Sequence, residues 1–238
     1  MTAEDDRVWA VVPAAGAGTR MGTEVPKQYL PLLGRPLIEH TLERLLSHPR
    51  IAGVVVAVAA GDERWRALGL AGRPGVTTVT GGAERCHSVL NALAWLLGQG
   101  HGGAWVLVHD AARPCLSHGE IDRLLEALAE DPVGGLLGLP VRDTMKRAGA
   151  QDRVAGTVPR EGLWHALTPQ MFRTGALHGA LGAALDRGEL VTDESSAMEL
   201  AGHAPRLVPG RPENIKVTRP EDLALAELYL RQQGGSTG

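Results

Sequence analysis

Apolar runs rich in valine alternate along the chain with segments whose apolar residues recur every three or four positions. The runs predict strands buried on both faces, at residues 7–15, 53–60, 76–82, 105–114 (running into a loop) and 134–141. The amphipathic segments predict helices at residues 36–48, 62–68, 83–97 and 117–130. Ser117 and Glu120 have the spacing of a capping box at the start of the last helix. This alternation predicts an α/β fold: a single Rossmann-like domain over residues 1–238, with a mostly parallel mixed sheet and helices on both faces.

Small or polar residues follow three of the predicted strands directly. The segments read PAAGAG (13–18), TGG (80–82) and HDAARP (109–114). Ligands of open α/β sheets bind beyond the carboxyl ends of the strands. We therefore expect these three segments to converge on one crevice.

Residues 142–163 interrupt the alternation with two short polar segments, DTMKRA and RVAGTV, joined by a turn. They predict a protruding β-hairpin arm, and an isolated hairpin is marginal in water, so it is expected to pack on something such as a second subunit. Near the C-terminus, residues 214–218 (NIKVT) predict a strand. Thr218 and Glu221 then have capping-box spacing before a helix at 220–232. The tail, residues 233–238, is expected to be disordered.

Composition and charge narrow the classes of function. The chain has 238 residues, 44% hydrophobic and 21% charged, with a net charge of -3. No basic surplus supports nucleic-acid binding, and neither a signal peptide nor a membrane-spanning run is expected. Cys86 and Cys115 are expected to be free thiols in a reducing cytoplasm. No histidine spacing indicates a metal site held by the protein.

The glycine-rich segment PAAGAGTRMGTEVPKQY (13–29) indicates phosphate binding. The third glycine of a dinucleotide fingerprint is absent, and so is the P-loop ending GK[ST]. Small residues leave the backbone amides open to a triphosphate, and Arg20 and Lys27 add cations able to contact it. Lysine occurs only at Lys27, Lys146 and Lys216, and two of these lie in segments with the character of a site. A tight turn with solvated cations is the structural alternative.

The full string GAGTRMGTEVPKQY resembles the signature of sugar-phosphate nucleotidyltransferases. Its PKQY ending is similar to the 2-C-methyl-D-erythritol 4-phosphate cytidylyltransferase family of the non-mevalonate isoprenoid pathway. The similarity continues, in the family's order, through GGAERCHSV, VLVHDAARP, PVRDTMKR, WHALTPQMF, TDESSA and NIKVTRPEDL. It spans nearly the whole chain.

The resemblance implies that an oxygen of methylerythritol phosphate attacks the α-phosphorus of CTP and pyrophosphate leaves. The implied catalytic residues are Arg20, Lys27, Arg160 and Lys216. The implied nucleotide-binding residues are Ala14, Ala15, Gly16, Gly82, Ser88 and Asp110. The implied sugar-phosphate-binding residues are Asp110, Arg113, Thr144, Arg160, Thr168, Thr192 and Lys216. Mg²⁺ is expected to bind through the phosphates of CTP, with Asp110 as the one candidate protein contact.

The resemblance also implies a homodimer in which the arm completes the neighbour's sugar-phosphate pocket. Two points stay open at this level: Arg85 is either a nucleotide contact or a structural ion-pair residue, and Leu167 stands where the family usually has glutamine. Two other functions compete. One is a cytidylyltransferase acting on ribitol 5-phosphate with the same fold, and the other is a regulatory module that binds CTP without chemistry.

Overall fold

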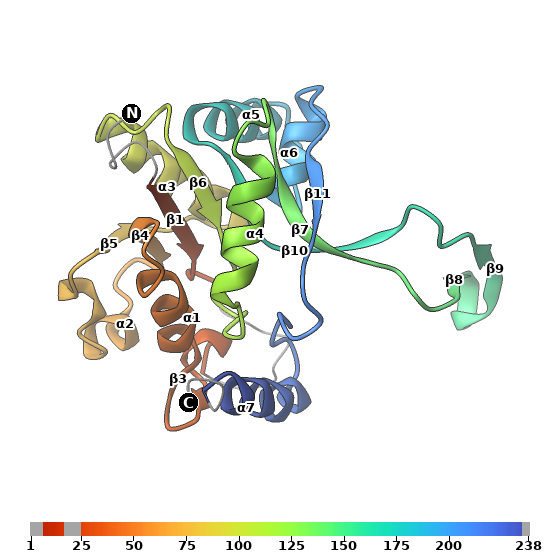
Figure 1. Ribbon diagram of the computed structural model, residues 1–238, viewed down its shortest axis with the longest axis horizontal. Helices are drawn as coiled ribbons and strands as arrows, with labels where there is room; N and C mark the ends of the chain where they lie inside the picture. Colours follow the sequence, from red (N-terminus) through yellow and green to blue (C-terminus); the bar gives the residue numbers. More distant parts are fainter. Residues whose placement is uncertain (1–6, 17–24, 235–238) are drawn as a thin grey trace.

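A seven-stranded mixed sheet forms the centre of the computed structural model, which describes residues 7–16 and 25–234 (Figure 1). Its strand order is β11-β7-β10-β6-β1-β4-β5. The strands are β1 (Val8–Pro13), β4 (Ile51–Val58), β5 (Val76–Thr80), β6 (Trp105–Val108), β7 (Gly134–Pro140), β10 (Trp164–Arg173) and β11 (Arg206–Pro209). Strand β10 runs antiparallel to both of its neighbours, and the other pairings are parallel. The predicted mostly parallel mixed sheet is confirmed.

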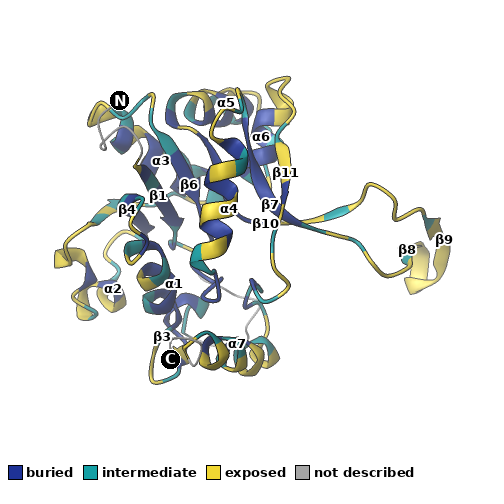
Figure 2. Cartoon of the chain, in the orientation of Figure 1, coloured by how far each residue is buried: buried dark blue, intermediate teal, exposed yellow. Residues whose placement is uncertain are grey.

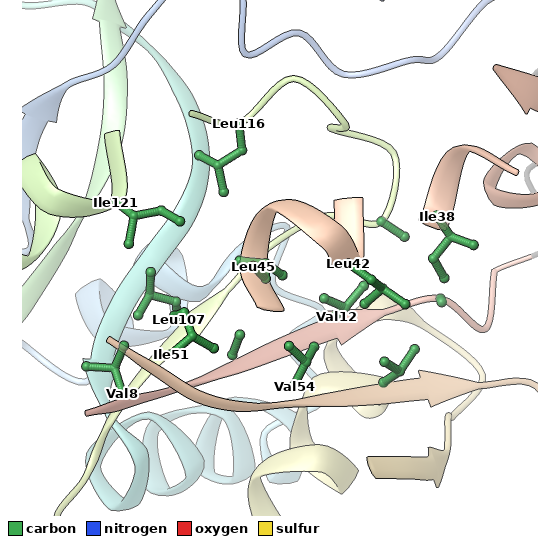
Figure 3. Packing of buried hydrophobic residues seen from close by; sticks show 14 of the residues in the cluster. Val8, Val12, Ile38, Leu42, Leu45, Ile51, Val54, Leu107, Leu116 and Ile121 are labelled. Carbon is green, nitrogen blue, oxygen red and sulfur yellow. The ribbon is translucent and has the colours of Figure 1, made fainter. Parts of the chain in front are cut away.

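Helices cover both faces of this sheet, as predicted. Alternate strand residues face opposite sides: Val54 and Val56 of β4 join one apolar cluster, whereas Val55 joins the other. On the first face lie α1 (Leu37–Leu46), α2 (Glu63–Ala67) and α4 (His118–Leu128). On the second lie α3 (Arg85–Gly98), α5 (Thr174–Asp186) and α6 (Glu194–Leu200). Figure 3 shows Leu42 and Leu45 of α1 packed over strand residues of the first cluster.

A third, smaller apolar cluster anchors the C-terminal helix α7 (Pro220–Gly234). It packs Ala226 and Leu230 of that helix against residues around the short pair β2 (Pro31–Leu32) and β3 (Arg35–Pro36). The segment before α7 therefore runs past the loop that follows β6, and the amide of Val217 donates to the carbonyl of Ala112 at 2.8 Å.

Three details of the C-terminal region differ from the sequence-based expectations. Residues 214–218 form no strand, and β11 occupies the edge of the sheet instead. The segment 214–218 lies at the crevice described below. The carboxylate of Asp222, not that of Glu221, accepts from the amide and hydroxyl of Thr218. Helix α7 extends through Gly234, so residues 233 and 234 are helical. The rest of the predicted tail, 235–238, lies outside the described residues.

The predicted arm is a two-stranded hairpin that projects from the sheet (Figure 1). Strands β8 (Met145–Ala148) and β9 (Val154–Val158) pair antiparallel, and Lys146 donates to the hydroxyl of Thr157 across them at 2.6 Å. Figure 2 shows that most of the arm is exposed, and Val154 is 65% exposed. The weak apolar content of residues 142–163 explains why this hairpin does not join the core.

Candidate active site

A pocket of about 270 Å³ lies where the loops after β1, β5 and β6 meet. The expected convergence of three separate segments is therefore confirmed. The segment 214–218 closes the pocket from a fourth direction. The lining residues are Pro13, Ala14, Ala15, Gly16, Lys27, Gln28, Gly82, Ala83, Glu84, Arg85, Ser88, Asp110, Ala111, Ala112, Lys216 and Thr218.

The first loop is tied to the lysine turn by one side chain, that of Gln28. Its amide nitrogen donates to the carbonyl oxygens of Ala14 at 2.8 Å and of Gly16 at 3.1 Å. Gln28 is only 4% exposed and follows Lys27 in a 3-10 turn. This contact couples the position of the Lys27 backbone to the first loop. Arg20, the other predicted cation, lies outside the described residues.

The second loop packs so closely on its surroundings that a side chain does not fit at Gly81 or at Gly82. A Cβ added at Gly81 would lie 2.4 Å from Cβ of Ala15, and one added at Gly82 would lie 2.3 Å from Cβ of His87. The amide of Gly82 donates to the hydroxyl of Ser88 at 3.0 Å, which fixes the loop to the start of α3. Of these two glycines, Gly82 lines the pocket, so the second loop presents backbone without a side chain there.

The third loop brings a carboxylate into contact with three cations. Asp110 Oδ1 accepts from Arg85 Nε at 3.0 Å, and Oδ2 lies 2.7 Å from Lys216 Nζ and 3.7 Å from Arg113 Nε. Burial opposes the charged form of this carboxyl, yet the charges of Arg85, Lys216 and Arg113 hold the pKa of Asp110 well below its ordinary value. Asp110 is thus an anion that gathers cations at the pocket.

A hydrogen-bonded chain fixes the backbone of Asp110. Its amide donates to the hydroxyl of Thr168 at 3.1 Å, and that hydroxyl lies 3.0 Å from Nδ1 of His109. His109 Nε2 lies 3.0 Å from the carbonyl oxygen of Arg113 and must donate to it. Nδ1 of the neutral ring then accepts the Thr168 proton, so each polar group of the chain is satisfied. His109 therefore has a structural position here.

Because His109 is fully buried, its pKa is lowered to about 4 from 6.5. A base whose pKa is lower in the folded state stabilises the fold above its unfolded pKa. That stability is lost as the pH falls from 6.5 to about 4. The loss corresponds to about 3 kcal/mol. We predict that urea unfolding from pH 7 to pH 4 shows this decrease in the wild type and a smaller one in His109→Gln. Equal decreases in the two proteins would contradict this assignment.

Several predicted site residues do not line the pocket of their own chain. Arg113 and Thr168 are buried behind Asp110, with 7% and 4% exposure, and the guanidinium of Arg113 donates to the carbonyl of Asn214 at 2.7 Å. Thr192 is exposed just before α6. Thr144 and Arg160 are exposed on the arm, where Arg160 donates to the carbonyl of Arg142.

Leu167, which stands where the family usually has glutamine, is 7% exposed and belongs to the first apolar cluster. A Cβ added at Gly210 would lie 2.9 Å from its Cδ1. Leucine at this position thus packs in the core and leaves the lining of the pocket unchanged.

Two side chains that support the site were not identified from the sequence. Gln28 belongs to the PKQY string, which does not by itself indicate a supporting contact. Glu194 is 0% exposed, and its two oxygens accept from the terminal nitrogens of Arg85 at 2.6 and 2.9 Å. Arg85 is thereby an ion-pair residue that also lines the pocket. Glu194 falls within the TDESSA segment, but nothing in that segment marks it as the partner of Arg85, which is 109 residues away.

Within residues 7–16 and 25–234, no three side chains of the metal-binding types gather into a cluster. The same part of the chain has no helix long and apolar enough to cross a membrane. Both cysteines are free, as expected, and both are buried. The cytoplasmic location stays a prediction.

Comparison with known proteins gives a consistent result. The family model IspD, 2-C-methyl-D-erythritol 4-phosphate cytidylyltransferase, matches residues 8–232. The enzyme of that name from Aeromonas hydrophila is 58% identical over 225 residues, covering 94% of this chain and 90% of the relative. The one from Pseudomonas putida F1 is 56% identical over 226 residues, covering 94% of both.

Solved structures agree with the sequence relatives. The crystal structure of 4-diphosphocytidyl-2C-methyl-D-erythritol synthase superposes with a TM-score of 0.83 at 36% identity, covering 94% of this chain and 99% of that one. The sequence identity extends over nearly the full length of the relatives. The pocket, the fold and the seven sequence segments agree with the same family. The chain belongs to the 2-C-methyl-D-erythritol 4-phosphate cytidylyltransferase family.

Proposed function

We propose that this chain transfers the cytidylyl group of CTP to 2-C-methyl-D-erythritol 4-phosphate, in the synthesis of isoprenoid precursors. Family membership carries the assignment of reaction and substrates. The observation that supports it in the structure is the pocket itself, where bare backbone from two loops meets Lys27 and Lys216 from two others. Such a site suits a triphosphate and a second phosphate.

The reaction needs little from the protein besides position and charge. The acceptor phosphate is already an anion, so an oxygen of it attacks the α-phosphorus of CTP without a strong base, and the bond to pyrophosphate breaks. We assign Ala14, Ala15, Gly16, Gly82 and Ser88 to nucleotide binding. Lys27, together with Arg20, stabilises the charge that develops at the phosphorus.

Lys216 orients the attacking phosphate on the other side of the reaction. Its ammonium is held by Asp110 at 2.7 Å while 33% of its side chain stays exposed, so it is fixed and still accessible. Asp110 also reaches the pocket and is proposed to contact hydroxyl groups of the substrates. Two cations placed before the reaction cost no reorganisation in the transition state.

Mg²⁺ is proposed to enter with CTP. The donor set fits a metal carried by the substrate better than one held by the protein, because both oxygens of Asp110 already contact cations. Bound on the phosphate oxygens, the ion would neutralise charge and ease the departure of pyrophosphate.

The remaining sugar-phosphate contacts are proposed to form in a homodimer. Thr144 and Arg160 lie on the exposed arm and not in the pocket of their own chain, which supports a role for them in the partner's site. Thr192, next to α6, is assigned to the same substrate. Arg113 and Thr168 are proposed to support the site without lining it. Thr168 fixes the backbone of Asp110, and Arg113 fixes the segment before Lys216.

Mixing two inactive variants tests the exchanged arm. Lys27→Ala and Arg160→Ala are each expected to be inactive, but dimers containing one of each have one site with both residues intact. Random exchange of subunits makes half of the dimers mixed, so about a quarter of the wild-type activity should return. No recovery after verified exchange would mean that Arg160 acts in its own chain. A monomeric mass in light scattering would contradict the dimer itself.

Release of pyrophosphate from CTP, Mg²⁺ and each of two acceptors tests the reaction. Turnover with methylerythritol phosphate and little with ribitol 5-phosphate is the expected result. The reverse preference would favour the ribitol enzyme. Binding of CTP with no pyrophosphate from either acceptor would favour the regulatory module.

A further inference from the structure

The carboxylate of Glu194 is buried beside the pocket, yet no step of the reaction above uses it. Its side chain is 1% exposed, and both of its oxygens face the guanidinium of Arg85. Burying two charges costs free energy that their attraction offsets only in good geometry, so such a pair is weak evidence for stability. A role in the site explains it better.

Glu194 is held rigidly by contacts to the residues on both sides of it. The amide nitrogen of Gln170, on β10, donates to Asp193 Oδ2 at 2.9 Å, and the amide oxygen of Gln170 accepts from the backbone of Ser195 at 2.8 Å. Asp193 also caps α6 by accepting from the amide of Ser196. The start of α6 is therefore attached to the central sheet, and the Glu194 carboxylate has a fixed position.

From Glu194 a line of alternating charges leads to the pocket. Arg85 uses its two terminal nitrogens on Glu194 and its Nε on Asp110 Oδ1. The other oxygen of Asp110 holds Lys216. Both carboxylates are buried and the ammonium of Lys216 is at the pocket, so each group in turn orients the next.

We propose that Glu194 is a positioning residue that acts through Arg85 and Asp110 to place Lys216 for the reaction. With Glu194 in place, Arg85 presents only Nε to Asp110, which leaves one carboxylate oxygen for Lys216. Without that charge, the guanidinium is able to turn its forked edge onto Asp110 and compete with Lys216. This inference rests on the proposed function, in which Lys216 orients the attacking phosphate.

The proposal has a signature that a loss of structure does not share. Replacing Glu194 by its neutral isostere makes the surroundings of the pocket more positive, which does not disfavour a polyanion. Glu194→Gln should lower kcat by about 10- to 100-fold, because Lys216 is then misplaced for the reaction. In calorimetry without acceptor, its Kd for CTP should stay within about 3-fold of the wild type or become tighter.

Glu227→Gln is the matched control. It makes the same change at the exposed pair between Glu227 and Arg231, joined at 2.6 Å on α7. Its kcat should stay within about 2-fold of the wild type, because exposed pairs contribute little. If Glu227→Gln lowered kcat as much as Glu194→Gln does, the proposal would be overturned.

Arg85→Lys provides a second variant if Glu194→Gln does not fold. A lysine keeps the charge but cannot bridge both carboxylates as the guanidinium does, so it should show the same loss of kcat with CTP binding retained. A double-mutant cycle with Lys216→Ala then tests the route. If Glu194 acts through Lys216, adding Glu194→Gln to Lys216→Ala should lower kcat/KM by less than about 3-fold.

Three further outcomes would overturn the inference: a kcat within about 3-fold of the wild type in both variants, a loss of CTP affinity as large as the loss of kcat, or effects that multiply in the double variant. None of these is confused with failure of the proposed function. That failure would appear in the wild type, as the absence of pyrophosphate release from CTP and methylerythritol phosphate.

Discussion

Replacing Lys27 with alanine should lower kcat by about 10²- to 10³-fold, a loss of about 3–4 kcal/mol of transition-state stabilisation. Lys27 lines the pocket at the start of a turn that Gln28 ties to the first loop. The Lys27 backbone is thus fixed at the pocket before the substrates bind. Since negative charge grows there mainly in the transition state, the Kd for CTP should change by less than about 5-fold.

Steady-state kinetics and calorimetry of CTP binding together test this expectation. Lys146→Ala is a suitable control, because Lys146 lies on the exposed arm and bonds Thr157. It should change kcat less than Lys27→Ala does. Equal losses in kcat and in CTP affinity for Lys27→Ala would show that the lysine binds the ground state and would remove its catalytic role.

Asp110→Asn should destabilise the fold by about 3–5 kcal/mol, since it removes the carboxylate from a buried charge cluster and leaves Arg113 and Lys216 without that counter-charge. Arg85, Arg113 and Lys216 all contact this carboxylate, which is 9% exposed. Because the pKa of Asp110 is depressed, its contribution is present above the ordinary value of 3.8 and lost below it. Urea unfolding at pH 7 therefore measures the full effect.

Glu189→Gln is the control for this variant, at an exposed pair with Arg187. Its free energy of unfolding should change by less than about 1 kcal/mol. If Asp110→Asn were as stable as the wild type, the carboxylate would not be what gathers the three cations. The activity of any folded Asp110→Asn protein should also be low, because Lys216 loses the group that holds it.

The secondary structure of the central elements is predictable from the sequence, because it depends on residues close together along the chain. The valine-rich runs became β1, β4 and β5, and Ser117 with Glu120 forms the expected capping box. The same holds for the crevice, since carboxyl ends of parallel strands share one edge of a sheet. The amphipathic segments likewise became helices on both faces, because a strand buried on both sides requires cover on both sides.

Other elements depended on partners far along the chain. Strand β10 was recognised only as part of a motif, and its antiparallel place between β6 and β7 is a matter of pairing. Residues 214–218 have the composition of a strand, but the sheet edge is taken by β11 and the segment instead bonds Ala112 beside the pocket. Composition alone does not show which segment pairs at the edge of the sheet.

What the sequence determined by itself is the set of groups available for the chemistry: a loop of small residues, a few lysines and arginines, and a string of segments typical of one family. How these groups work together depends on contacts that form only in the folded chain. It brought Glu194, Arg85, Asp110 and Lys216 into contact across as many as 109 residues of sequence. The physical reason is that charge interactions act through space and depend on burial, and the order of residues does not show which distant charged groups meet or how deeply they are buried where they meet.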